Sequence, residues 1–193
     1  MKLRPVNNAA REGWVLSRIQ RVPVQLLTER AFQPYGEVLA PKEQPADFQG
    51  VNSIGWKVRF EIEDAPVIMT LCSSHKGFRF SKVERHFRVT QTFIPIGRVP
   101  SIVAVASPTD HSTLPLPEDV TAFVIDGSAG YSLHKGTWHS LDRYPLYPPS
   151  SQVVIITSRK TQTEIETADR NDWALTQEVD YEAQFGIIFE LSL

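Results

Sequence analysis

The chain of 193 residues has few of the features that mark secreted, membrane or disulfide-rich proteins. Its single cysteine, Cys72, cannot form an intramolecular disulfide, and its place in the apolar run 67–72 predicts a buried thiol in a reducing compartment. No run approaches the ~18 consecutive apolar residues that span a bilayer. We therefore expect a cytoplasmic protein without a membrane partner.

The sequence also lacks a surplus of charge of one sign. Twenty Lys and Arg face 22 Asp and Glu, which gives a formal net charge of -2. A nucleic-acid backbone or an anionic membrane is held by an excess of positive charge. This balance argues against a nucleic-acid partner.

The first 21 residues lack the apolar central region of a secretory signal. We interpret residues 1–21 as a loosely ordered N-terminal extension and residues 22–193 as a single domain, because a chain of this length can bury one sizeable core. An organelle-targeting peptide is the alternative for the extension, and its single serine, Ser17, argues against it.

Short strand-like segments are what the sequence has in abundance. Residues 56–62 alternate apolar and charged side chains at every step, which predicts a half-buried strand. Further apolar or β-branched runs cover residues 67–72, 102–106, 122–125, 153–156 and 186–191. Most of the fourteen prolines and ten glycines fall between these runs. Many short strands separated by turn residues predict a mainly β sandwich or barrel.

Helix-forming patterns are scarce. Thr28 can cap a short helix over residues 29–32. The acidic segment 161–182 can be a loop or a short helix with a solvated face. The closing run 185–191 is apolar enough to need a partner strand, in its own sheet or across a subunit boundary.

One strand-like segment, residues 78–86, carries side chains suited to chemistry. Its alternation places Phe78, Phe80, Lys82, Glu84 and His86 on one face. If the phenylalanines point into a barrel, the carboxylate and the imidazole do too, and they then need partners or a ligand. The alternatives are an internally satisfied pair, or a strand whose inward face is the other one.

A second segment, residues 134–139, begins and ends with histidine. Its glycine, Gly136, supplies a sharp turn, so His134 and His139 can face one pocket. His75 and His111 lie in polar stretches and read as loop residues.

Both segments resemble known motifs. The spacing Glu84-x-His86-x4-Gln91-x5-Gly97 resembles the first cupin motif, and residues 134–139 resemble the second, with histidine where proline is usual. In a metal-binding cupin the ligand positions would be those of Glu84, His86, Gln91 and His139. The resemblance thus implies an optional divalent metal ion with mixed nitrogen and oxygen ligands, and no other cofactor.

A closer resemblance, from about residue 22 to 189, is to the ureidoglycolate lyase family. Its most specific block is Glu84-Arg-His86 followed by Thr90-Gln-Thr-Phe-Ile-Pro95. Supporting segments are Phe32-x-Pro-Tyr-Gly-Glu-Val38, the run 102–106, Phe123-x-Ile-x-Gly127 and Gly136-Thr-Trp-His139. The resemblance implies a cupin-like barrel of the double-stranded β-helix or jelly-roll type with few short helices. It also implies a homodimer that splits ureidoglycolate into glyoxylate and urea during allantoin and purine breakdown.

That reaction needs a base for the substrate hydroxyl and an acid for the leaving nitrogen. The residue types for these roles are present in Glu84, His86 and His139, with either histidine as the base. A bound divalent ion can instead make the same residues ligands. The predicted substrate-binding residues are Gln91, His134, Lys135, Trp138, Arg143 and Arg159, with the three cations as candidates for the substrate carboxylate.

Two departures from the family pattern bear on the substrate. Residues 140–144 intervene before Pro145-Leu146, where the family has Pro-Leu or Pro-Met soon after the Trp-His step. The strand-like run that ends at residue 159 lacks the aspartate of the Asp-Arg pair found in the family, although Arg159 retains the arginine. The alternatives are therefore a cupin-fold binding protein, an enzyme for another small carboxylic acid, or a metal-dependent oxygenase.

Overall fold

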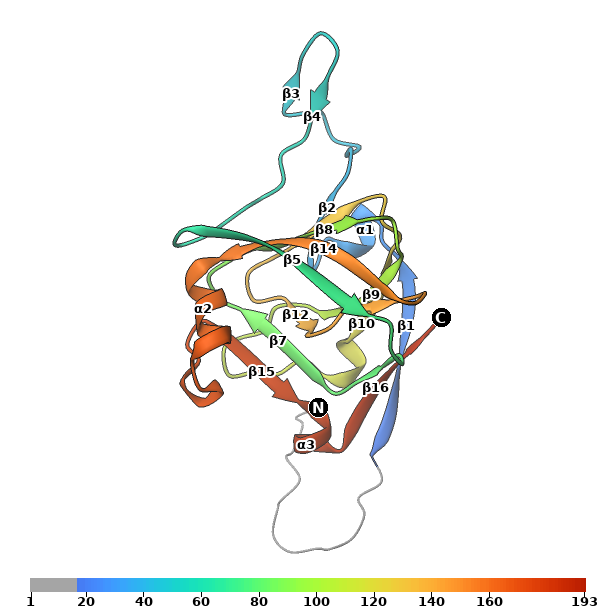
Figure 1. The fold of residues 1–193 in the computed structure, drawn as a ribbon, viewed down its shortest axis with the longest axis vertical. Helices are drawn as coiled ribbons and strands as arrows, with labels where there is room; N and C mark the ends of the chain where they lie inside the picture. The colour runs from blue at the N-terminus through green and yellow to red at the C-terminus, as the bar shows by residue number, and fades with distance from the viewer. Residues whose placement is uncertain (1–16) are drawn as a thin grey trace, which may run out of the picture.

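A computed structural model describes residues 17–193, and residues 1–16 of the predicted extension lie outside the described part. The domain is mainly β, with two curved sheets forming a cupin-like barrel (Figure 1), which confirms the predicted fold class. Strand β1 (Arg18–Leu26) begins before residue 21, so the predicted domain boundary falls within a strand. No helix of the described residues is long and apolar enough to cross a membrane.

The strands form two large sheets. In spatial order the larger sheet contains β15 (Thr176–Asp180), β7 (Lys82–His86), β12 (Trp138–Ser140), β9 (Ser101–Ala106), β10 (Thr121–Ile125), β1, β16 (Ile187–Ser192) and β6 (Arg79–Phe80), with β13 (Tyr144–Pro145) paired to β9. The smaller sheet contains β2 (Gly36–Leu39), β11 (Gly130–Leu133), β8 (Gln91–Ile96), β14 (Ser150–Ser158) and β5 (Pro66–Ser74). A hairpin of β3 (Phe48–Gln49) and β4 (Ile54–Gly55) projects away from the barrel (Figure 1).

The two sheets pack face to face through one apolar cluster, which is the barrel interior. Phe93 and Tyr131 of the smaller sheet and Val105 and Phe123 of the larger sheet belong to this cluster. A second cluster on the other face of the larger sheet includes Trp138. Side chains alternate along a strand, so each strand of the larger sheet can send one residue into the barrel and the next one outward.

The sequence analysis predicted the short helices only in part. Helix α1 (Glu29–Phe32) begins after Thr28, whose Oγ1 accepts from the backbone N–H of Ala31 at 3.2 Å, as predicted. The acidic segment 161–182 contains most of α2 (Arg159–Thr167), but also β15 and the start of α3 (Tyr181–Phe185). Strand β15 was missed because its residues are polar, and its partner β7 is far away in sequence.

The prediction of a strand over residues 56–62 is wrong. The backbone there is extended but unpaired, apart from one bridge between Ile62 and Val89. Its alternate N–H groups donate to side chains instead. The N–H of Lys57 reaches Asp47 at 2.7 Å, that of Arg59 reaches Glu37 at 3.1 Å, and that of Glu61 reaches Thr90 at 2.8 Å. The twofold period therefore indicated an extended chain correctly, but a strand needs a neighbouring backbone in register.

The prediction of a buried Cys72 is also wrong, because its side chain is exposed. It lies on β5, at the edge of the smaller sheet, where Met69 and Leu71 face the core and the residues between them face outward. A continuous apolar run does not distinguish the two faces of such a strand.

Arg85 shows how the outward face of β7 is anchored. Its guanidinium donates to the carbonyls of Thr109, Asp110 and His111 at 2.7, 3.2 and 2.9 Å and stacks over the Trp138 ring at 4.3 Å. We expect Arg85→Met to lower the free energy of unfolding by about 3 kcal/mol, because three carbonyls lose the charged donor of a side chain that is itself buried. Urea denaturation at constant m-value measures this. Arg88→Met, at an exposed ion pair, should cost under about 1 kcal/mol; equal losses would contradict the anchoring role.

Candidate active site

Strands β7 and β12 bring two histidines and a glutamate together on the barrel face of the larger sheet. Their antiparallel register pairs His139 with Glu84, and His86 follows two residues later on the same face. One ligand-type atom from each residue lies within 4.8 Å of the others. The structure therefore assembles the three residues that the sequence analysis nominated for catalysis.

Each imidazole has one hydrogen-bond partner, and the partner of His139 defines the position of its proton. Glu84 Oε1 lies 3.9 Å from His86 Nε2 and 3.9 Å from His139 Nδ1. The carbonyl of Ser140 accepts from His139 Nδ1 at 3.2 Å, and because a carbonyl only accepts, neutral His139 carries its proton on Nδ1 and a lone pair on Nε2. His86 Nδ1 lies 3.1 Å from the Thr176 hydroxyl.

Burial shifts the pKa of each of the three side chains in the direction that favours its neutral form. It raises the pKa of Glu84 to about 7, an effect opposed by the positive charge of Arg143 and assisted by the negative charge of Glu178. Burial lowers the pKa of His86 to about 4 and that of His139 well below its usual range. At neutral pH the histidines are therefore free bases, while Glu84 exchanges its proton readily.

Four buried polar atoms around this group have no hydrogen-bond partner among the described residues. They are His86 Nε2, Gln91 Oε1, His139 Nε2 and Arg143 Nη2. Buried polar atoms are nearly always paired in native proteins, so a set of this kind points to a ligand. Imidazole nitrogens with carboxylate and amide oxygens are a donor set that suits a divalent transition metal.

The space between these residues is small. The side chains of His86, Gln91 and His139 help to line a hollow that has no room for a free water molecule. The turn at Gly136, which has a φ of 78°, donates its N–H to the His86 carbonyl at 2.7 Å and covers the hollow. His134 lies on the same turn and lines the same hollow. A substrate would enter only if side chains at this rim moved.

Arg143 is the buried cation of the site. It comes from residues 140–144, the segment by which this chain departs from the family pattern. Its Nε donates to the Tyr131 hydroxyl at 2.7 Å, and its Nη1 donates to the Ser140 carbonyl at 2.9 Å. That carbonyl is the one that orients His139. The shared acceptor places the guanidinium beside the histidine.

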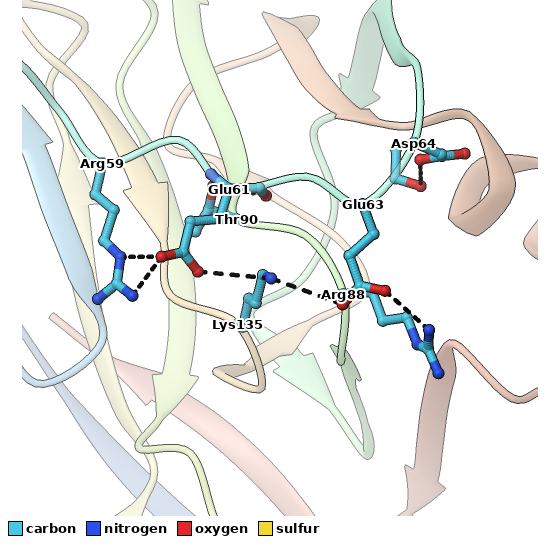
Figure 2. Close-up of polar contacts among 8 residues, drawn as sticks. Arg59, Glu61, Glu63, Asp64, Arg88, Thr90 and Lys135 are labelled. Atoms are coloured by element: carbon cyan, nitrogen blue, oxygen red, sulfur yellow. Dashed lines mark hydrogen bonds and ion pairs between the residues drawn. The ribbon is translucent and has the colours of Figure 1, made fainter.

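The other predicted substrate-binding residues lie elsewhere. Trp138 is buried in the second cluster, on the face opposite His139. Arg159 is exposed at the start of α2. Figure 2 shows Lys135 between two acidic side chains, with its Nζ 3.5 Å from Glu61 and 3.8 Å from Glu63. The structure therefore brings Gln91, His134 and Arg143 to the site, and does not bring the other three.

Two site residues were missed by the sequence analysis. Tyr131 lies on β11 and Thr176 on β15, and both contact the group through their hydroxyls. Tyr131 had a detectable signal, because it lies two residues before Leu133, on the same face of a strand, and so carries a polar hydroxyl toward the apolar interior. Thr176 had none, since its strand was not predicted.

Comparison with known proteins tests the resemblance. The model of the ureidoglycolate lyase family matches residues 19–179, which is most of the chain. The chain belongs to the ureidoglycolate lyase family. This confirms the predicted family and, at that level, the prediction of an enzyme.

Individual members of the ureidoglycolate lyase family are distant relatives. A ureidoglycolate lyase of Pseudomonas paraeruginosa is 30% identical over 132 residues, covering 63% of this chain and 75% of the relative. The Schizosaccharomyces pombe ureidoglycolate lyase is 28% identical over 150 residues, covering 63% and 76%. The Azotobacter vinelandii enzyme of the same name is 27% identical over 127 residues, covering 60% and 73%.

Proposed function

We propose that this protein splits ureidoglycolate into glyoxylate and urea, as part of allantoin and purine breakdown, in a pocket inside the barrel. The observation that carries the proposal is the convergence of Glu84, His86 and His139 in a protein of this family, with unpartnered polar atoms around them. The names of the relatives support the choice of substrate.

The reaction moves one proton from oxygen to nitrogen. A base removes the proton of the substrate hydroxyl, the C–O bond becomes a carbonyl, the C–N bond breaks, and an acid protonates the leaving ureido nitrogen. The lone pair on His139 Nε2 suits it as the base, and His86 is the alternative. Glu84, whose pKa is raised to about 7, is suited to supply the proton and be recharged.

The same residues can hold a divalent metal ion. Glu84, His86 and His139 would be its ligands, with Gln91 as a fourth. Such an ion supplies Lewis acidity that polarises the substrate hydroxyl. In that case Arg143 still binds the substrate, and the turn at Gly136 still shields the hollow from water.

The substrate carboxylate is assigned to Arg143. This cation has a buried Nη2 without a partner and no carboxylate within 4 Å among the residues that the structure describes. A buried guanidinium is costly without an anion, so a bound carboxylate stabilises both. Of the two other candidates, Lys135 is paired with Glu61 and Glu63, and Arg159 is exposed at the start of α2.

Proton NMR of racemic ureidoglycolate with the purified protein tests the function. We expect glyoxylate and urea to appear faster than in the uncatalysed reaction and to stop near half conversion if one enantiomer is used. Loss of the acceleration with EDTA would assign the triad to a metal. No acceleration in a folded sample supplied with divalent ions would overturn the lyase proposal and favour a cupin for another small carboxylic acid.

The assignment of the carboxylate site gives a direct prediction. Arg143→Gln should raise KM for ureidoglycolate about 100-fold, because it removes a charge-assisted pair in a dry site. Lys135→Gln should change KM less than about 3-fold, because Lys135 is half-exposed and paired with acids. Steady-state kinetics on both variants checks this, and the reverse order of effects would move the carboxylate site to the surface turn.

We further infer, from the family, that the protein works as a cytoplasmic homodimer. Sedimentation equilibrium of the full chain measures the oligomer. A mass near twice 21.8 kDa is the expected result, and a single-chain mass at micromolar concentration would contradict it.

A further inference from the structure

Only some of the N–H donors of the Arg143 guanidinium have hydrogen-bond partners, and these partners indicate which residue holds the side chain in place. The Nε donates to Tyr131, and Nη1 donates to the carbonyls of Ser140 and Asp142 at 2.9 and 3.3 Å. Nη2 has no partner among the described residues. A guanidinium has five N–H donors in a fixed plane, so the three bonds leave the remaining edge for a ligand.

The acceptors of these three hydrogen bonds lie in different parts of the fold. Ser140 and Asp142 belong to the same short segment as Arg143, so their carbonyls move with it. Tyr131 lies on β11 of the smaller sheet, whereas His139 lies on β12 of the larger sheet. The Tyr131 bond is therefore the hydrogen bond that fixes the guanidinium across the barrel.

Aromatic packing makes this bond rigid. The Tyr131 ring stacks on Phe93, with centroids 5.0 Å apart and planes 18° from parallel. The Arg143 guanidinium carbon lies 4.1 Å from the centroid of the same Phe93 ring. Tyr131 is 1% exposed, so neither the ring nor the hydroxyl exchanges its contacts with water.

The chemistry of the acceptor suits a binding role. A neutral phenol oxygen satisfies Nε without neutralising the guanidinium, whereas a carboxylate in its place would cancel the positive charge. The full charge therefore remains available to an anion at Nη2.

We propose that Tyr131 is a positioning residue, which holds Arg143 so that Nη2 faces a bound carboxylate and thereby makes the site specific for a carboxylate-bearing substrate. The part that concerns turnover rests on the lyase function proposed above. Tyr131 itself makes no contact with the reacting atoms in this proposal.

Tyr131→Phe tests this, because it removes the hydroxyl and keeps the stacked ring. We expect KM for ureidoglycolate to rise about 10-fold with kcat changed less than about 3-fold, since the lost interaction serves the ground state and the transition state alike. In an Arg143→Gln background the same substitution should have no further effect on KM. An undiminished effect in that background would overturn the positioning role.

Calorimetric binding of glycolate and of its neutral amide, glycolamide, tests the proposal without turnover. Tyr131→Phe should weaken glycolate about 10-fold and leave glycolamide unchanged. Arg143→Lys, which keeps the charge but not the planar fork, should weaken glycolate to a similar extent. Tyr144→Phe, which removes a buried hydroxyl from the second cluster, is the matched control and should change neither ligand.

The outcomes separate this inference from the proposed function. Glycolate binding that depends on Tyr131 and Arg143, in a protein without lyase activity, would support the inference and overturn the function. Lyase activity and glycolate affinity that both survive Tyr131→Phe, in a variant with unchanged melting temperature, would overturn the inference alone.

Discussion

Replacing His139 with alanine is expected to lower kcat/KM for ureidoglycolate by about 10³-fold, which is within the range that a positioned general base contributes. The reason is local. His139 is 2% exposed, carries its proton on the nitrogen that faces the Ser140 carbonyl, and offers its lone pair on the other. A metal ligand at this position would show a loss of similar size, and metal analysis of the purified variant separates the two roles.

A second substitution, His139→Asn, is the control for misfolding of the His139→Ala variant. Asparagine at position 139 keeps an amide nitrogen near the place of Nδ1, so it preserves the bond to Ser140 while removing Nε2. We expect His139→Asn to be as inactive as His139→Ala and to keep the native melting temperature. His75→Ala, at an exposed histidine, should retain full activity. Activity within 10-fold of the native protein in either His139 variant would exclude a chemical role.

Glu84→Gln is expected to lower activity and raise stability together. It keeps the volume and one oxygen acceptor of the carboxyl group but cannot donate an acidic proton or bind a metal as an anion. We expect kcat to fall about 10²-fold or more. In EDTA at pH 8 we expect the free energy of unfolding to rise by about 3 kcal/mol, because the variant no longer buries a carboxylate.

The pH dependence fixes the sign of this stability change. Burial raises the pKa of Glu84 from 4.5 to about 7 in the folded protein. The stability that the protonated carboxyl contributes is therefore fully present below pH 4.5 and is lost as the pH rises through 7. The gain of Glu84→Gln should be near zero at pH 4.5 and largest at pH 8. Urea titrations at both pH values measure it.

A control substitution of the same chemistry is available on the surface. Glu63→Gln removes an exposed carboxylate paired with Arg88, and it should show no rise in stability between pH 4.5 and pH 8. Near-normal turnover in Glu84→Gln would exclude Glu84 as the acid. An unchanged stability difference across the pH range would show that its carboxylate is hydrated in the folded protein.

Much of this protein follows from local sequence. Short apolar runs between prolines and glycines predicted the β class, and Thr28 predicted the first helix. The alternation within residues 82–86 placed Glu84 and His86 on one face, because successive side chains of a strand point to opposite sides. The prediction that Phe78 and Phe80 share this face is wrong: the strand is interrupted between β6 and β7, and both rings pack against the second cluster. The sequence motifs were sufficient to identify the family, since they are local strings of residues that need no knowledge of the fold.

Other features were decided only by the tertiary structure. Residues 56–62 have the period of a strand, but their N–H groups found side-chain oxygens and not a neighbouring backbone. Cys72 is exposed because its strand lies at a sheet edge with one face outward. In both cases the sequence specified the local conformation, while the burial and pairing depended on segments distant in the chain.

The identity of the cation in the site was also decided by the tertiary structure and not by the sequence. The sequence offered Lys135, Arg143 and Arg159 with nothing to choose among them, because each lies near a motif. The structure buries Arg143 beside His139 and ties it to Tyr131, which comes from the opposite sheet. Strand alternation is a property of the local chain and can be read from its residues. Contact between two sheets depends on how they close around a shared core, and that is set by packing across the whole domain.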